Sequence, residues 1–275
     1  MTRQQKIFNG LKTFFYAVRP LLLYILVPGV CLSIGYIVRH YSNGKNQFFY
    51  ESGNFYTCLS LVIIWLILKK RAKKRDTTLS KDATLDMGEW NTKLCLLYGA
   101  FGAASSFFLS ALITIMPSFM TKSYKADSSE IFSGADLVLV IITVVFMAPV
   151  LEEMIFRGYM LNRLLGFFGE KAAIYITAVI FALCHANIIW IIYAFAFGLL
   201  LAWISIKKDN ILFSICVHIG FNLPSAFIAC INYSTGAKNV LFGNRLIVFF
   251  MGTIGFMTAL LIYRYVRKID TELFN

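Results

Sequence analysis

Eight stretches of the sequence approach the roughly 20 apolar residues that a helix needs to cross a bilayer. They are residues 20–38, 55–68, 94–116, 137–165, 172–188, 189–206, 211–231 and 245–266. Backbone polar groups find no water inside the hydrocarbon, so segments of this kind fold as helices. The sequence therefore predicts an all-α, polytopic transmembrane helical bundle of about eight helices, with residues 1–275 forming a single integral membrane domain.

The composition excludes an ordinary soluble domain, because 59% of the residues are hydrophobic and 15% are charged. A formal net charge of +12 would suit a nucleic acid, but the basic residues cluster between the apolar stretches. That pattern is typical of membrane loops, so we expect the lipid bilayer and no nucleic acid as a partner. The six cysteines lie within apolar stretches without paired spacing, which indicates small buried side chains rather than disulfides or a zinc cage.

The positions of the basic residues predict the orientation of the chain. Lys and Arg are frequent in the N-terminal arm, in the segment 69–81 and after the fourth, sixth and eighth stretches, whereas the intervening loops hold only scattered positive charges. Cytoplasmic loops carry this excess, so both termini are expected in the cytoplasm. The first helix shows no small-residue cleavage site and is expected to be retained. The protein would then lie in the cell membrane of a bacterium or the endoplasmic reticulum of a eukaryote.

Two adjacent carboxylates and an arginine follow the apolar run that begins at residue 137. An ionisable residue inside the membrane costs several kcal/mol and is therefore a functional-site hypothesis. On a helix, Glu153 and Arg157 stand at positions i and i+4 and can pair. Glu152 points roughly 100° away and has no such local partner. We therefore assign Glu152 to the chemistry and expect Glu153 and Arg157 to support the structure.

Two histidines and an asparagine are predicted at the same depth as Glu152. Counted from the cytoplasmic end of each stretch at about 1.5 Å per residue, Glu152 lies at about 20 Å, His185 at about 21 Å and Asn222 at about 18 Å. His218 shares a helix face with Asn222, one turn away. A lone histidine in a membrane helix often only hydrogen-bonds a carbonyl, but this convergence of polar groups on one level predicts a single polar site.

Three motifs in these segments resemble those of the CPBP intramembrane proteases. They are Glu-Glu-x-x-x-Arg at 152–157, Phe-x-x-x-His at 181–185 and His-x-x-x-Asn at 218–222. That family includes the CAAX prenyl endopeptidases and bacterial relatives, some of them linked to bacteriocin immunity or peptide maturation. The resemblance covers about residues 137–232, the expected catalytic core. It implies an intramembrane endopeptidase acting on a membrane-associated peptide or protein.

Hydrolysis of a peptide bond needs an activated water and a group that stabilises the oxyanion. We expect Glu152 and His185 to orient and deprotonate the water, and His218 and Asn222 to donate hydrogen bonds to the oxyanion; the resemblance implies the same roles. Phe181 is expected to pack in the core. Pro149 removes a backbone hydrogen bond just before Glu152, which gives room for the water.

Other readings of the same residues remain open. A glutamate with two histidines is a possible zinc set, but the sequence has no His-Glu-x-x-His spacing and asparagine is a poor zinc ligand, so we expect no cofactor. A proton-coupled membrane carrier also needs intramembrane Glu and His, although it should show repeated halves. A non-catalytic membrane immunity or binding protein would not need the complete set. Neither the substrate nor the oligomeric state follows from the sequence.

Overall fold

The computed structural model describes residues 3–41, 53–75, 90–132, 137–185, 187–235 and 245–273. Every regular element within these ranges is a helix, so the all-α prediction is confirmed. The elements are α1 (Arg3–Tyr41), α3 (Gly53–Arg75), α4 (Thr92–Ile115), α5 (Ser118–Phe132), α6 (Leu137–Val140), η1 (Ile141–Met147), α7 (Ala148–Glu153), η2 (Met154–Leu161), α8 (Asn162–Phe168), α9 (Glu170–Leu183), α10 (Ile188–Lys208), α11 (Ile211–Thr235) and α12 (Arg245–Leu273).

Among the described residues, five helices are long and apolar enough to cross a membrane. They are Gln4–Val38, Thr92–Ile115, Val138–Phe168, Ile188–Lys208 and Leu246–Ile269. Two shorter apolar helices, Phe55–Leu68 and Ile211–Phe227, accompany them. The protein is therefore an integral membrane protein, and the prediction of about eight helices is close to what the structure shows.

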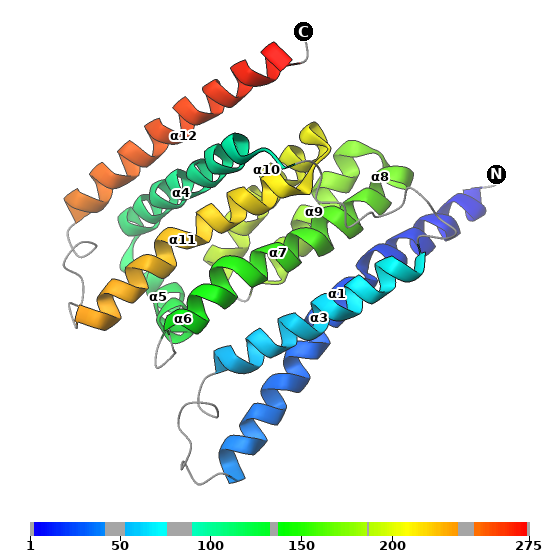
Figure 1. Cartoon of the computed structure of the whole chain (residues 1–275), viewed down its shortest axis with the longest axis horizontal. Coiled ribbons are helices and arrows are strands. Elements are labelled where there is room, and N and C mark those ends of the chain that lie inside the picture. Colours follow the sequence, from blue (N-terminus) through cyan, green and yellow to red (C-terminus); the bar gives the residue numbers. More distant parts are fainter. Residues whose placement is uncertain are drawn as a thin grey trace.

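The elements α6 to α8 follow one another without a break and form one long helix over residues 137–168, which we call the central helix. It packs against α1, α3, α9, α10 and α11 and lies in the middle of the bundle (Figure 1). Two of its segments, η1 and η2, are π-helical, and they flank the short α7 that carries both glutamates. Such wide turns are rare and occur often at functional sites.

Glycines bring three helices close together on one side of the molecule, where α4 lies between α11 and α12 (Figure 1). A Cβ atom on Gly102 of α4 would fall on the carbonyl oxygen of Val217, and one on Gly220 of α11 would fall on that of Gly99. Small residues of this kind let membrane helices approach until their backbones touch. These three helices form a wall beside the central helix.

The stretch 172–188 does not form one membrane-spanning helix, which corrects the prediction. Helix α9 ends at Leu183 after 14 residues, or about 21 Å, against the roughly 30 Å of a bilayer core. A turn follows, and α10 then begins behind Asn187, whose side-chain oxygen accepts a hydrogen bond from the Ile189 amide. This N-cap fixes the start of α10. His185 therefore lies in the turn between α9 and α10, and not within a helix as expected.

Helix α5 occupies a segment that we expected to be a loop. Asn187 donates a hydrogen bond from Nδ2 to Ser123 Oγ of α5 at 3.0 Å. The Tyr124 ring meets the Trp190 ring edge-on, with centroids 6.0 Å apart. Helix α5 therefore packs on the turn that carries His185. A count of apolar residues misses this helix because its sequence is short and largely polar.

The beginning of α1 and the end of α12 lie at the same end of the bundle, toward the upper right of Figure 1. This arrangement is compatible with two termini on one side of the membrane. Their location in the cytoplasm stays a prediction from the charge pattern.

Candidate active site

Glu153 and Arg157 form a buried ion pair within the central helix. Arg157 Nη1 lies 2.8 Å from Glu153 Oε1, and the two side chains are 1% and 0% exposed. Arg157 also donates from Nη2 to the carbonyl oxygen of Gly198 on α10 at 3.2 Å. Its guanidinium lies over the Phe181 ring, 4.6 Å from the ring centroid. Buried charges are retained when they are paired and hydrogen-bonded in this way.

His218 of α11 connects the two glutamates. Its Nδ1 lies 3.0 Å from Glu153 Oε1, and its Nε2 lies 3.7 Å from Glu152 Oε2. An ionised carboxylate only accepts hydrogen bonds, so Nδ1 carries the hydrogen that it donates to Glu153. Glu153 was expected to face Arg157 and to point away from the water site. In the structure it contacts both Arg157 and the candidate catalytic histidine.

Glu152 has a partner that the sequence did not suggest, the hydroxyl of Tyr24 on α1. The Tyr24 hydroxyl donates to Glu152 Oε1 at 2.6 Å, a length typical of a hydrogen bond to an ionised acceptor. The Glu152 side chain is 16% exposed, so it is not sealed in the core as Glu153 is. A tyrosine within the first apolar stretch was the available signal. It is a weak one in a chain with 14 tyrosines.

His185 is held by the helix end that precedes it. Its Nδ1 lies 3.0 Å from the Phe181 carbonyl oxygen, which only accepts, so Nδ1 donates and Nε2 is the acceptor of the neutral ring. The Phe181 ring contacts both histidine rings edge-on, with centroids 5.1 Å from that of His185 and 5.9 Å from that of His218. Phe181 packs in the core as expected and in addition links His185 to the rest of the site.

Asn222 occupies a gap in the hydrogen bonding of the central helix. The Ala148 amide donates to Thr143, and residue 149 is proline, so the Val144 carbonyl receives neither of its usual helical donors. Asn222 donates to that carbonyl from Nδ2 at 2.9 Å. Neighbouring helices commonly satisfy groups that a membrane proline frees. The amide nitrogen carries two hydrogens, so this bond uses one of its two donors.

The structure thus brings Glu152, Glu153, Arg157 and His218 into direct contact, with His185 adjoining them through Phe181. Asn222 lies one turn beyond His218 on α11. Over the part of the chain that the structure describes, no group of three or more His, Cys, Asp or Glu side chains is placed to hold a metal ion. This arrangement brings a carboxylate close to one oriented imidazole, with a second imidazole nearby; a common face for all four candidate side chains stays a prediction.

Comparisons with known proteins agree with the motifs. Residues 134–224 match the family model of the Rce1-like type II CAAX prenyl endopeptidases. The chain is 22% identical over 169 residues to the UPF0177 protein YxdF of Lactococcus lactis subsp. lactis (strain IL1403). The matched region covers 60% of this chain and 89% of that relative. No solved structure matches the chain.

The matched region begins just before the central helix and ends just after Asn222, and therefore contains all three motifs. The helices α1, α3, α4, α5 and α12 lie outside it, although α1 contributes Tyr24 to the site. The resemblance that the motifs predicted is confirmed: residues 134–224 match the domain of the Rce1-like type II CAAX prenyl endopeptidases.

Proposed function

We propose that the protein hydrolyses a peptide bond of a membrane-associated peptide or protein with a water that Glu152 activates. The observation that carries the proposal is the 3.7 Å between Glu152 Oε2 and His218 Nε2, beside a Phe181 ring that also contacts His185. At this separation Glu152 can hold a water about 2.6–3.2 Å from its Oε2 while His218 Nε2 reaches the substrate oxygen that becomes the oxyanion. The match of residues 134–224 to the family model supports the reaction class in general, and the assignment of roles is ours.

Glu152 acts as the general base. Its Oε2 takes a proton from the water as the water oxygen attacks the scissile carbonyl carbon, while Tyr24 keeps the other carboxylate oxygen in place. His185 accepts a hydrogen bond from the same water at Nε2, because its Nδ1 is engaged by Phe181. When the tetrahedral intermediate collapses and the C–N bond breaks, Glu152 returns the proton to the leaving amine.

His218 and Asn222 stabilise the oxyanion. In its protonated form His218 donates from Nδ1 to Glu153 and from Nε2 to the substrate oxygen. Asn222 donates its second amide hydrogen, the first being held by Val144. Preorganised donors of this kind contribute about 3–4 kcal/mol each to transition-state stabilisation. Glu153 is thus a positioning residue for His218 as well as the partner of Arg157.

We propose that this chemistry needs no cofactor. Glu153 Oε1 and His218 Nδ1 are hydrogen-bonded to each other, which removes both atoms as metal ligands, and asparagine, another of the candidate side chains, is a poor zinc ligand. Purified active protein should contain well under one equivalent of zinc, and chelators should leave cleavage nearly unchanged. The scheme would be contradicted if the protein held stoichiometric zinc, lost its activity when that zinc was removed and regained it when zinc was returned.

The test compares peptides in membranes from cells that produce the wild type or the Glu152→Gln variant. Uncut substrates should accumulate with Glu152→Gln, because glutamine keeps the shape but accepts no proton. Tyr24→Phe removes one hydrogen bond to a charged group, worth about 1.5–3 kcal/mol, and should slow cleavage about tenfold to a hundredfold. Glu170→Gln is the matched control, an exposed glutamate at the start of α9.

An unchanged peptide profile for Glu152→Gln would remove the protease proposal. Loss of proton-driven uptake in that variant would then favour the carrier. Retention of a protective phenotype by a catalytically dead variant would favour a sequestering immunity protein.

A further inference from the structure

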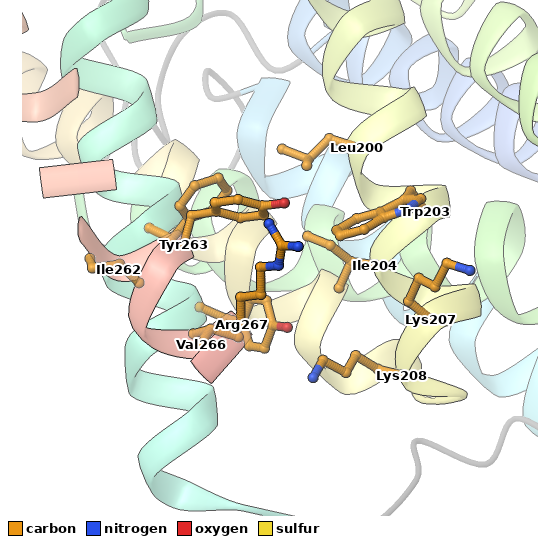
Figure 2. Close-up of a pocket in the computed structure, with 11 residues that line it drawn as sticks. Leu200, Trp203, Ile204, Lys207, Lys208, Ile262, Tyr263, Val266 and Arg267 are labelled. Atoms are coloured by element: carbon orange, nitrogen blue, oxygen red, sulfur yellow. The ribbon is translucent and has the colours of Figure 1, made fainter. Parts of the chain in front are cut away.

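A pocket of about 300 Å³ lies between α4, α10 and α12, away from the polar cluster of the central helix (Figure 2). This volume is at the lower end of the range for small-molecule sites, about 300–1,000 Å³. Its lining comes from α4 and α12, which lie outside the region that matches the family model, and from the second half of α10. None of the residues that carry the proposed chemistry lines it.

The mouth of the pocket is positively charged. Three of its eleven lining residues are cationic, Lys207, Lys208 and Arg267, and none is acidic. Figure 2 shows the Arg267 guanidinium reaching from α12 toward α10, with Lys207 and Lys208 on the facing wall. Lys207 and Arg267 are exposed, so an anion can reach them from outside the bundle.

The interior of the pocket is apolar. Leu200 and Ile204 of α10 and Ile262 of α12 form its walls, and aromatic rings complete them. Trp203 and Tyr263 stand at the rim and are 40% and 43% exposed. Aromatic side chains with one polar end are enriched at membrane–water interfaces, where their rings lie among the lipid headgroups. An apolar interior with a cationic, aromatic rim matches the two ends of an amphiphile.

The pocket also lies at the level where such an amphiphile is found. Lys207 and Lys208 form the last turn of α10. By the charge pattern this end faces the cytoplasm, and the cytoplasmic leaflet carries the anionic lipids of a cell membrane. Each Lys or Arg near that surface adds about 1 kcal/mol of attraction to anionic lipid.

We propose that this pocket binds an anionic phospholipid. Its phosphate lies between Arg267 and the pair Lys207–Lys208, and the upper part of an acyl chain runs along Leu200 and Ile204. A free phosphate would use the cationic rim and leave the apolar walls uncovered. A zwitterionic lipid would use the walls but bring no net negative charge to the rim. The site is separate from the proposed catalysis, so either proposal can fail alone.

The experiment titrates short-chain phosphatidylglycerol into the purified full-length protein in a neutral detergent and follows the melting temperature. Arg267→Gln and Lys207→Gln should each weaken binding about fivefold, which corresponds to about 1 kcal/mol. Arg264→Gln removes the same charge from the same end of α12 but does not line the pocket, and should change the affinity less than twofold. Leu200→Trp narrows the apolar part, keeps every charge, and should also weaken binding.

Two further ligands separate the possible sources of the anion. Phosphatidylcholine of the same chain length should bind at least tenfold more weakly, and inorganic phosphate should not displace phosphatidylglycerol at millimolar concentration. Equal affinity for the two lipids would overturn the proposal. So would an equal loss in Arg264→Gln, which would indicate general surface charge, or competition by phosphate alone. The melting temperature measured without lipid identifies a variant that is misfolded. If Arg267→Gln is misfolded, the comparison with Arg264→Gln is made with Lys207→Gln instead.

Discussion

The polar side chains of the site satisfy one another across helices. Glu153 accepts hydrogen bonds from Arg157 on its own helix and from His218 on α11. Glu152 accepts one from Tyr24 on α1. Two side chains, those of Arg157 and His218, therefore donate hydrogen bonds to Glu153. Arg157 is bonded to one carboxylate, that of Glu153, and otherwise donates to a neutral backbone carbonyl. This difference predicts unequal effects when each member of the ion pair is removed.

Removing either side of the ion pair should destabilise the fold, because the other charge stays buried. The expected cost is about 3–5 kcal/mol in the free energy of unfolding. Glu153→Ala should cost more than Arg157→Ala, since the arginine then keeps only the Gly198 carbonyl and the Phe181 ring and no carboxylate, while the glutamate would keep His218. Glu152→Gln should leave the free energy of unfolding nearly unchanged. Denaturant titration of purified variants in detergent measures all three.

A double variant provides the control for that series. Replacing Glu153 with Leu and Arg157 with Met removes both charges together and should be less destabilising than either single alanine change. Equal stability of the three single variants would mean that the two glutamates are assigned to the wrong roles.

Asn222 has a structural role, its hydrogen bond to the Val144 carbonyl, that can be tested separately from its proposed role in catalysis. Asn222→Ala leaves the Val144 carbonyl without a donor, at a cost of about 1–3 kcal/mol in the free energy of unfolding. Pro149→Ala restores a backbone N–H that can reach this carbonyl. In the Pro149→Ala background the Asn222→Ala change should therefore cost less than half as much, measured as a double-mutant cycle. Strictly additive effects would contradict the hydrogen bond as the reason for the cost.

The parts of the site that the sequence predicts are those that follow from local geometry. The spacing of Glu153 and Arg157 on one helix is enough to predict their ion pair. Tyr24 lies 128 residues from Glu152, and His218 lies 65 residues from Glu153. Apolar periodicity fixes neither the rotation of a helix about its axis nor its neighbours, so those contacts could not be predicted. Depth alone predicted that the groups share a level.

At the scale of elements, helices were predictable where a stretch is long and apolar. The departures concern the two elements that meet at His185. Helix α9 ends early because the His185 ring and amide bind carbonyls of its last turn and Asn187 caps the next helix. Helix α5 is polar and lies against that turn, so hydropathy does not reveal it. Side-chain capping and tertiary packing, rather than hydropathy, decide both.

The close contact of α4 and α11 predicts that Gly220 tolerates no side chain. A Cβ at this position meets the backbone of Gly99, which cannot move aside as a side chain can. Gly220→Ala should destabilise the protein by about 1–3 kcal/mol, the range for overpacking. Gly166→Ala is the control, because a Cβ there meets nothing within 4 Å; it should be neutral or stabilise by about 0.5–1 kcal/mol. Melting of both variants without substrate compares them, and equal melting temperatures would exclude the glycine contact as a constraint.

At the scale of the whole molecule, the alternation of basic loops predicts the orientation in the membrane. A reporter fused after Lys74 should report the cytoplasm, and a reporter placed within residues 123–133 should report the outside. A third fusion after Lys208 should report the cytoplasm and checks the alternation in the second half of the chain. The opposite result after Lys208 would reverse the leaflet to which the phospholipid pocket opens, and the opposite result at either other position would contradict the orientation predicted from the basic loops.

The bond between Asn222 and Val144 has a consequence for the synthesis of the protein. The ion pair of the central helix can form as soon as that helix forms. The Val144 carbonyl, however, receives its hydrogen bond from Asn222, which is synthesised 78 residues later. At about 5–20 residues per second, the ribosome needs roughly 4–16 s to reach it. During that interval the half-finished chain holds an unsatisfied carbonyl, and a glutamate still lacking its histidine, at membrane depth. Until α11 packs against the central helix, the insertion machinery, or water inside it, must supply hydrogen bonds to these polar groups.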